Sequence, residues 1–314
     1  MTRYLLALTL LAATAAQAQE AGTPTQALIT LDSKTPAILA AKDVTAKVDN
    51  RLTPLTNLSA VPANGAQVAL LIDDGLRTIV GRELNALRSF ITTLPAGTEI
   101  FVGYMQNGRV VPGTDLTGFT ADRATAAQSL HLPTGIPGSS ASPYFCLSDF
   151  VKNWPSVAEG QMSQQSQQPT RKARFVLMIT NGVDPYNGST SILNQNSPYV
   201  DAAVTDAQRA GVPVYSIFFS DAGFGRGRGT FSGQSYLSQL AQGTGGVAYY
   251  LGQGNPVSLD PYLKQFQQAM TETYVATFPV DTNKKMVSLK LGTDLPKTKL
   301  RGPDQVRPGT IVAN

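Results

Sequence analysis

Residues 68–74 read Val-Ala-Leu-Leu-Ile-Asp-Asp, five apolar residues followed directly by two carboxylates. An apolar run of this length without polar alternation predicts a strand buried on both faces, which is typical of a parallel sheet covered by helices on both sides. Asp73 and Asp74 then follow the carboxyl end of that strand. Ligands of open α/β sheets bind at this end, close to the point where the strand order reverses. The stretch therefore predicts a class of fold and the edge of the sheet where a ligand would bind.

Strand-like and helix-like patterns alternate from residue 68 to residue 273. Further buried strands are predicted at 174–180 and 212–220, and apolar residues spaced by three and four from Val80 to Leu94 predict one continuous helix face after the first strand. Asn107-Gly108 joins two short β-prone runs and is a strong hairpin signal. Together these patterns predict a doubly wound, mostly parallel α/β sheet with one antiparallel edge strand.

Short β-prone runs also occur near both ends of the chain, outside the alternating region. We expect runs from the two ends to pair with each other and to form a small β appendage. The predicted organisation is a signal peptide at 1–18, an N-terminal β segment at 19–66, the α/β domain at 67–273 and a C-terminal β segment at 274–314.

The first residues have the composition of a secretory signal. Arg3 precedes the apolar run Leu5–Ala16, and Ala16-Gln17-Ala18 supplies the small residues that a signal peptidase requires. We therefore expect an exported protein, periplasmic or extracellular. No other stretch approaches the roughly 20 apolar residues of a membrane span, so no membrane-spanning segment is expected.

Composition excludes several classes of function. The chain of 314 residues has one histidine and one cysteine, which argues against a Ser-His-Asp triad, a histidine-rich zinc site and an internal disulfide. Cys146 lies between Phe145 and Leu147 and is expected to be a buried, inert thiol. The formal charge of +4, or +3 without Arg3, is too small to make nucleic acid the expected partner.

The order of motifs resembles the von Willebrand factor type A domain. The residues that carry the likeness are the buried strand ending in Asp73, the small-hydroxyl loop 138–142 before a helix, and the second buried strand ending in Thr180-Asn-Gly. The likeness extends from about Gln67 to about Thr273, and the segment Leu240 to Tyr250, with Tyr274 and Pro279, is similar to a bacterial secreted subgroup. The resemblance implies a doubly wound α/β fold and non-enzymatic binding at the carboxyl-end edge of the sheet.

Family members with a metal site resemble one another in an Asp-x-Ser-x-Ser run, a distant Thr and a distant Asp, which together coordinate Mg²⁺ or Mn²⁺. Here the first Asp matches Asp73, but the two Ser positions fall on Gly75 and Arg77. The Thr position falls on Ser142, with Ser140 as the alternative. The distant Asp position falls on Asn181.

These departures change the chemistry of the expected site. Mg²⁺ prefers six oxygen ligands at about 2.0–2.1 Å, whereas Gly75 has no side-chain oxygen and Arg77 is a cation. We therefore expect no metal cofactor, although Mg²⁺ or Mn²⁺ remains an alternative. Our hypothesis is that Arg77, four residues after Asp73, replaces the ion and neutralises the carboxylates.

Other residues near this edge have more than one interpretation. Asp184 would restore a carboxylate three residues beyond Asn181, but Asp184-Pro is also common turn chemistry. Ser142 is expected mainly as the N-cap of a helix that begins at Pro143. Asp74 is expected to be a solvated carboxylate. The aromatic residues Tyr144, Phe145 and Trp154 are expected in the core.

Two segments are predicted to be loops. The glycine-rich segment 223–229 does not match a dinucleotide fingerprint, because the third glycine would fall on Arg228 and the first buried strand carries no such motif. We expect a loop there, and an exposed loop at the glutamine-rich segment 161–168.

The predicted function is binding of a protein or surface component, without catalysis. The predicted binding face consists of Asp73, Asp74, Arg77, Ser140, Ser142, Asn181 and Asp184. One alternative is a hydrolase in which Asp73, Asp74 and Asp184 act as acid, base or metal-bridging carboxylates. Another is a structural or assembly component of the envelope.

Overall fold

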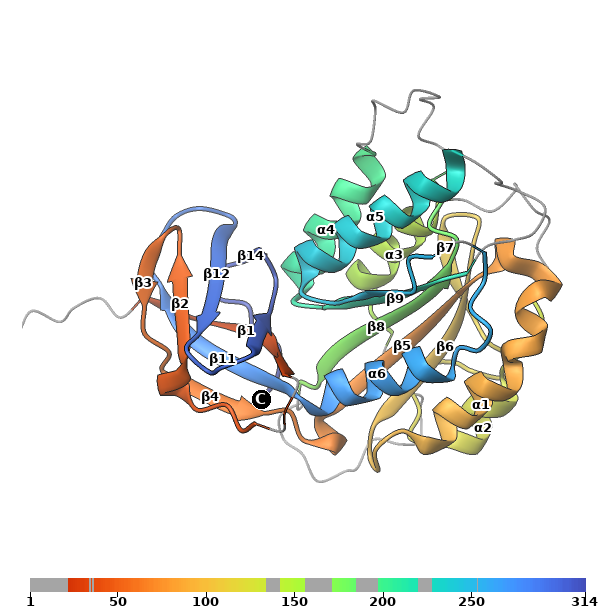
Figure 1. Cartoon of the computed structure of the whole chain (residues 1–314), viewed down its shortest axis with the longest axis horizontal. Coiled ribbons are helices and arrows are strands. Elements are labelled where there is room, and N and C mark those ends of the chain that lie inside the picture. The colour runs from red at the N-terminus through yellow and green to blue at the C-terminus, as the bar shows by residue number, and fades with distance from the viewer. Residues whose placement is uncertain are drawn as a thin grey trace, which may run out of the picture.

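The structure is a computed structural model that describes residues 22–33, 35, 37–133, 142–155, 171–184, 197–219, 228–252 and 254–314. The side chains of residues 77, 78 and 228–231 lie outside this description, as do the predicted signal peptide, the predicted loop at 161–168 and residues 223–227 of the predicted glycine-rich loop. Residues 228 and 229, the end of that predicted loop, are instead the first residues of helix α5 (Arg228–Thr244). Within the described ranges, none of the helices combines the length and the apolar composition that a membrane span requires. Figure 1 shows a larger α/β unit beside a smaller β unit.

A six-stranded sheet forms the centre of the α/β unit, in the order β10-β9-β8-β5-β6-β7. The strands are β5 (Ala66–Asp73), β6 (Glu99–Gln106), β7 (Arg109–Pro112), β8 (Ala173–Thr180), β9 (Val214–Phe218) and β10 (Ala248–Tyr249). All neighbours pair in parallel except β7, which pairs antiparallel with β6. The predicted doubly wound sheet with one antiparallel edge strand is confirmed, and its strand order reverses between β5 and β8.

Helices cover both faces of this sheet (Figure 1). They are α1 (Leu84–Thr93), α2 (Arg123–Gln128), α3 (Pro143–Lys152), α4 (Pro198–Ala210), α5 (Arg228–Thr244) and α6 (Asp260–Thr271). On β5, Val68, Leu70 and Ile72 pack toward α1, α2 and α6, whereas Ala69 and Leu71 pack toward α3, α4 and α5. Each of these five residues is 0% exposed, which explains why the strand is apolar at every position.

The segment after β5 differs from its prediction. Instead of one continuous α-helix, residues Asp74–Glu83 form a 3₁₀ helix, η3, and α1 begins only at Leu84. Leu76 and Val80 are nevertheless fully buried. The apolar spacing therefore identified the buried side but not the hydrogen-bond pattern, and the two glycines in η3 weaken the preference for an α-helix.

The β unit consists of two four-stranded antiparallel sheets, β13-β1-β11-β4 and β14-β12-β2-β3. Their strands are β1 (Thr23–Ser33), β2 (Val44–Val48), β3 (Arg51–Thr53), β4 (Asn57–Ala60), β11 (Thr273–Val280), β12 (Val287–Thr293), β13 (Thr298–Arg301) and β14 (Gln305–Val306). Short 3₁₀ turns occur at Ala41–Asp43 and Ala63–Gly65. Because β1 pairs with β11 and β13, and β2 with β12, the appendage combines both ends of the chain as expected.

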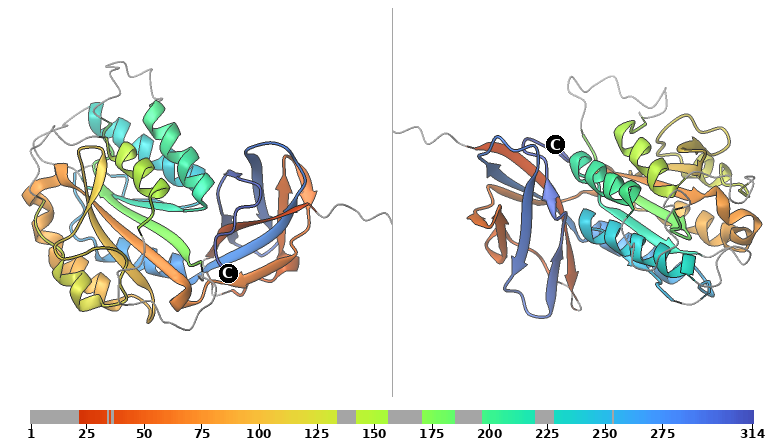
Figure 2. Two further views of the ribbon diagram at one scale, coloured as in Figure 1. Left: turned by 180° about the vertical axis from the view of Figure 1, so that it is seen from behind. Right: turned by 90° about the horizontal axis from the view of Figure 1, so that it is seen from above.

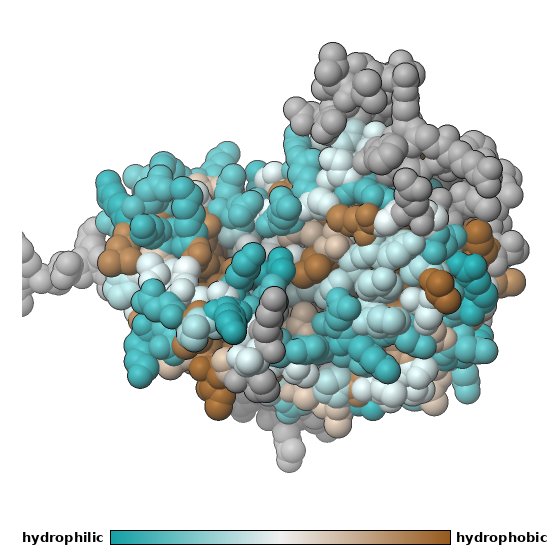
Figure 3. All heavy atoms as spheres, viewed as in Figure 1, coloured by the Kyte–Doolittle hydropathy of each residue, from teal (hydrophilic) through white to brown (hydrophobic). Residues whose placement is uncertain are grey.

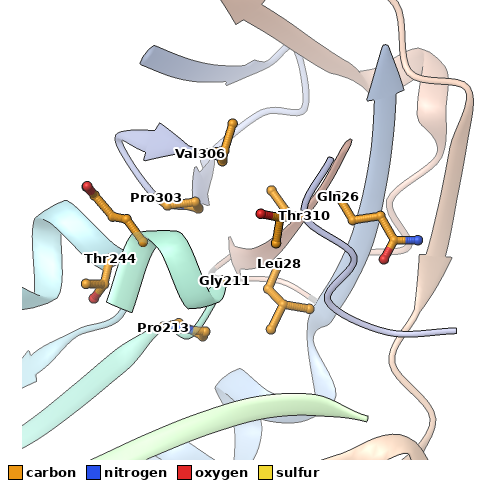
Figure 4. A pocket seen from close by; sticks show the side chains of 10 residues that line it. Gln26, Leu28, Gly211, Pro213, Thr244, Pro303, Val306 and Thr310 are labelled. Atoms are coloured by element: carbon orange, nitrogen blue, oxygen red, sulfur yellow. The ribbon is translucent and has the colours of Figure 1, made fainter. Parts of the chain in front are cut away.

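The two units lie side by side in both views of Figure 2. On the face shown in Figure 3, apolar residues form separate patches among hydrophilic ones. At the junction, the hydroxyl of Thr30 on β1 is hydrogen-bonded to the hydroxyl of Tyr215 on β9 (3.2 Å). Figure 4 shows a nearby cavity of about 10 Å³, lined among others by Leu28 and Pro213, which has room for about one water molecule. A larger pocket of about 260 Å³ also lies between the two units, lined by Thr30 and Asp32 of β1 and by Tyr249 and Gln268 of the α/β unit.

Candidate functional site

The candidate site lies where the strand order reverses, at the carboxyl ends of β5 and β8. Ile72 and Ile179 are partners in the register, so the next residues, Asp73 and Thr180, are neighbours. The Thr180 hydroxyl donates to Asp73 Oδ2 at 2.6 Å and accepts from the N–H of Gly182 at 3.0 Å. Thr180 therefore holds the carboxyl group of Asp73 in place. Thr180 was not among the predicted site residues, although its position at the end of the second buried strand was the available signal.

Asp73 is a buried carboxyl, 5% exposed. Its Oδ1 accepts a hydrogen bond from the N–H of Gly75 at 2.9 Å, so both carboxyl oxygens already have donors. Burial raises the pKa of Asp73 from 3.8 to about 6, against the opposing effect of the hydrogen bonds from Thr180 and Gly75. The charge of this side chain therefore changes in the weakly acidic range.

Asp74 does not lie in solvent as predicted. Its residue exposure is 2%, because η3 begins at Asp74 and turns the chain at once. Burial is the main cause that raises the pKa of both Asp73 and Tyr104, and the negative charge of Asp74 raises both further. Asp74 therefore belongs to the acidic interior of this edge.

The first turn of α3 is the second component of the site. Ser142 occupies the N-cap position before Pro143, as predicted, but its side chain makes no capping hydrogen bond. The N–H of Phe145, one of the donors that a capping side chain can bind, instead donates to the backbone carbonyl of Ser142 at 3.0 Å. Ser142 is 0% exposed, and its Oγ has no hydrogen-bond partner among the described residues. The expected capping role is therefore wrong.

Tyr144 and Cys146 connect this turn to the strand ends. The Tyr144 hydroxyl donates to the carbonyl of Gly182 at 2.7 Å. Burial raises the pKa of Tyr144 well above its usual value, and the charges of Asp184 and Asp73 raise it further. Cys146 is buried, as predicted, and burial raises the pKa of its thiol to about 12, which favours the unreactive protonated form.

The segment after β8 forms the third component. Asn181 Oδ1 accepts from the N–H of Val183 at 2.9 Å, which is a side-chain turn. Gly182 has φ +67°, and a Cβ there would lie 2.6 Å from the carbonyl oxygen of Gly233, so only glycine fits. Asp184 is 6% exposed and accepts a hydrogen bond from the Ser197 hydroxyl. The carboxylate predicted to restore the edge is therefore at that edge, where it connects β8 to the start of α4.

Two of the predicted residues cannot be placed in the same way. Ser140 lies outside the described residues, and of Arg77 only the backbone, within η3, is described. The proposed contact between Arg77 and the carboxylates remains a prediction.

The described donor set does not fit a Mg²⁺ or Mn²⁺ site. Both oxygens of Asp73 and the side-chain oxygen of Asn181 accept hydrogen bonds from the protein. Within the described ranges, no group of three or more His, Cys, Asp or Glu side chains is arranged to hold an ion. Six oxygens in an octahedral array are not assembled by these side chains.

An exposed aromatic ring stands at the rim of this edge. Phe145 is 48% exposed, and its ring centroid lies 6.0 Å from that of Tyr199 in an edge-on arrangement. Its predicted place in the core is wrong. The buried stripe of α3 contains Tyr144, Leu147 and Val151, and Phe145 follows Tyr144 by about 100° around the helix.

No protein-family model and no curated protein matches the chain. Similar solved structures include human COPII-coat protein Sec24c, with 8% identity and a TM-score of 0.42 over 82% of this chain and 44% of that one. The open conformation of pilus adhesin SpaC from Lactobacillus rhamnosus GG has 9% identity and a TM-score of 0.41 over 88% and 47%. Proximal thread matrix protein 1 from the mussel byssus has 15% identity and a TM-score of 0.40 over 76% and 51%.

The chain spans about half the length of these three structures. Similarities this low say nothing about what the chain does. The strand order of the central sheet, with its antiparallel edge strand and helices on both faces, is the doubly wound α/β arrangement that the resemblance to the von Willebrand factor type A domain implies.

Proposed function

We propose that the protein binds another protein or a surface component through the carboxyl-end face of its central sheet, without catalysing a reaction. This face comprises Asp73, Ser142, Phe145, Asn181 and Asp184. The observation that carries the proposal is the exposed ring of Phe145, 48% accessible, in the first turn of α3, next to Tyr144, whose hydroxyl is bonded to the Gly182 carbonyl after β8. Aromatic side chains, phenylalanine included, are enriched in protein interfaces relative to the rest of the surface.

The buried carboxylates suit a supporting role. Asp73 is bonded to Thr180 and Gly75, and Asp184 to Ser197. Groups held in this way fix the relative positions of β5, β8 and α4. The bond from Tyr144 to the Gly182 carbonyl ties the first turn of α3 to the same edge, so Phe145 is presented on a rigid support, which lowers the entropic cost of binding.

We also propose that the protein is exported and that its binding face holds no metal ion. The described oxygen donors fit Mg²⁺ poorly, which supports a metal-free face. The neutralising role of Arg77 belongs to the same proposal. The export proposal depends on the signal-like residues 1–18.

Affinity capture from the native envelope fraction tests this function. The unmodified mature chain should retain the same partners with and without EDTA, and Phe145→Ala should lose them. Leu52→Ala is the matched control, because Leu52 is 72% exposed on β3 of the β unit. Equal loss with both variants, or loss only on addition of EDTA, would contradict the proposal.

One observation favours the hydrolase alternative. A buried carboxyl with a pKa of about 6, as in Asp73, is typical of a general acid or base. An Asp73→Asn variant that folds normally but loses turnover on a panel of hydrolase substrates would support this alternative over binding. Absence of turnover in the unmodified protein on the same panel is the result that we expect.

A further inference from the structure

The pocket of about 260 Å³ at the junction of the two units has room for a small molecule. Ligand pockets occur preferentially between structural units, with volumes of about 300–1,000 Å³, and this one is slightly smaller. Its walls come mainly from β1 and β13 on one side and from β10 and α6 on the other. None of the lining residues belongs to the carboxyl-end face, so the pocket is separate from the function proposed above.

The wall formed by the β unit carries an ion pair. Thr30 and Arg301 are partners in the register of β1 and β13, and the Thr30 hydroxyl is bonded to Tyr215 of the α/β unit. Opposed residues, and residues two apart on one strand, share a face of the sheet, so Arg301 and Asp32 also face the α/β unit. Arg301 Nε and Nη2 both donate to Asp32 Oδ2, at 3.1 and 2.5 Å. Asp32 Oδ1 and Arg301 Nη1 have no partner among the described residues, so this wall offers a ligand both an acceptor and a donor.

The opposite wall is a polar stripe of α6, which ends beside the β unit (Figure 1). Its lining residues are Gln265, Gln268, Ala269 and Glu272. Because they are spaced by three, one and three residues, they lie on one side of the helix and its C-cap. Gln268 Nε2 donates to Glu272 Oε1 at 2.9 Å, whereas the side-chain amide of Gln265 has no partner within the described ranges. Ala269 is the smallest member of the stripe and leaves space between the two walls.

Tyr249 of β10 brings a hydroxyl group without a partner to the same pocket. The residue is 7% exposed and lines the pocket. Its ring is held in place by two others, with centroids 6.2 Å away at Tyr215 and 6.3 Å away at Tyr262. Buried tyrosines usually find a hydrogen-bond partner for the hydroxyl, but Tyr249 has none in the described part of the chain. A ligand in the pocket would supply that partner.

The lining favours an uncharged ligand that is rich in hydroxyl groups. Asp32, Glu272 and Arg301 together carry two negative charges and one positive charge, which does not favour an anion. Carboxylate, guanidinium and amide groups are planar and can each bond to two neighbouring polar atoms. A hydroxyl group both donates and accepts, so it can pair with any of them. Val247 and Ala269 add apolar surface for the C–H groups of such a ligand.

We propose that this pocket binds one sugar residue, either a free monosaccharide or the end residue of a glycan. A pyranose ring carries adjacent hydroxyl groups around an apolar C–H framework, which matches the mixed lining, and the small volume suits one ring. The Asp32–Arg301 pair, the Gln268–Glu272 bond and the rings around Tyr249 already hold the binding groups in place. Little side-chain entropy is therefore lost on binding.

Saturation-transfer NMR and calorimetry test the proposal with D-glucose, D-galactose, D-mannose and N-acetyl-D-glucosamine. We expect saturable binding of at least one of these sugars to the unmodified chain. Sodium phosphate and spermidine, an anion and a cation, should not displace it. The methyl glycoside of the sugar that binds separates the two sources. Equal or higher affinity for the methyl glycoside assigns the site to the end of a glycan, and lower affinity assigns it to the free monosaccharide.

Two variants locate the site. Ala269→Met keeps a good helix former but fills the pocket, so it should abolish saturable binding. Tyr249→Phe should weaken binding by about three- to tenfold and leave urea unfolding unchanged, because the hydroxyl bonds to nothing in the described ranges. Lys264→Met is the matched control, since Lys264 is exposed on α6 outside the pocket; it should bind like the unmodified chain.

Three results would overturn the proposal. The first is the absence of saturable binding with all four sugars. The second is displacement of the bound sugar by phosphate or spermidine, which would assign the pocket to a charged ligand. The third is undiminished binding in Tyr249→Phe together with undiminished binding in a folded Ala269→Met. If Ala269→Met does not fold, Tyr249→Phe alone decides.

Discussion

Replacing Thr180 with valine should destabilise the protein and change the titration of Asp73. Valine has nearly the same shape as threonine but cannot donate to Asp73 Oδ2, which the hydroxyl now does at 2.6 Å. It also cannot accept from the N–H of Gly182, now 3.0 Å away. Because Thr180 is 0% exposed, water does not replace either bond.

The magnitude follows from these two losses. A hydrogen bond to a charged group contributes about 1.5–3 kcal/mol, and an unsatisfied buried N–H costs about 1–3 kcal/mol. Because such losses are not strictly additive, we expect the free energy of unfolding to fall by about 2–4 kcal/mol. The hydrogen bond from Thr180 lowers the pKa of Asp73, so its removal should raise that pKa further.

Urea unfolding at neutral pH measures the first effect, and NMR titration of the Asp73 carboxyl carbon measures the second. The control is Thr92→Val, because Thr92 is exposed near the end of α1 and donates only to the carbonyl of Ser89. It should change stability by no more than about 0.5 kcal/mol. If Thr180→Val unfolds like the control and leaves the pKa of Asp73 unchanged, the assigned role of Thr180 is wrong.

Three further predictions concern the same edge. Because the pKa of Asp73 is raised from 3.8 to about 6 in the folded state, the neutral form of Asp73 favours folding. This contribution of about 3 kcal/mol to the free energy of unfolding should be complete below pH 4 and lost as the pH rises through 6. Asp73→Asn should remove this part of the pH dependence, which urea unfolding at several pH values measures. Gly182→Ala should lower the free energy of unfolding by about 1–3 kcal/mol or more, because φ is +67° and the new Cβ would lie 2.6 Å from the Gly233 carbonyl oxygen; an unchanged thermal melting curve would contradict the assigned backbone geometry. Arg77→Ser should increase the affinity for Mg²⁺ measured by calorimetry, whereas tight binding of Mg²⁺ by the unmodified chain would refute the proposed replacement of the ion.

The architecture could be predicted from the sequence because its signals are local and strong. The unbroken apolar run before Asp73 specified a strand buried on both faces, and Asn107-Gly108 specified the antiparallel hairpin that β6 and β7 form. Pairing of the two chain ends was also predictable, because short β-prone runs lay outside the alternating region at both ends. The strands β3 and β4 were not predicted, because three or four residues carry too little periodicity.

The environment of the site residues was less predictable. Sequence placed Asp74 at the correct edge but not in its interior, because that depends on the 3₁₀ turn that starts there. The sequence also gave Ser142 the features of an N-cap, but the Phe145 N–H bonds to the backbone instead. Exposure of Phe145 depends on which side of α3 faces the sheet, and Thr180 becomes important only through its partner on another strand.

Amide hydrogen exchange of the captured complex tests the central claim most directly. The account predicts slower exchange, relative to the free chain, at residues 142–146 and 181–184, where α3 begins and β8 ends, and no change at β3 and β4 of the β unit. Protection confined to the β unit, with unchanged exchange at the first turn of α3, would contradict binding through the carboxyl-end face.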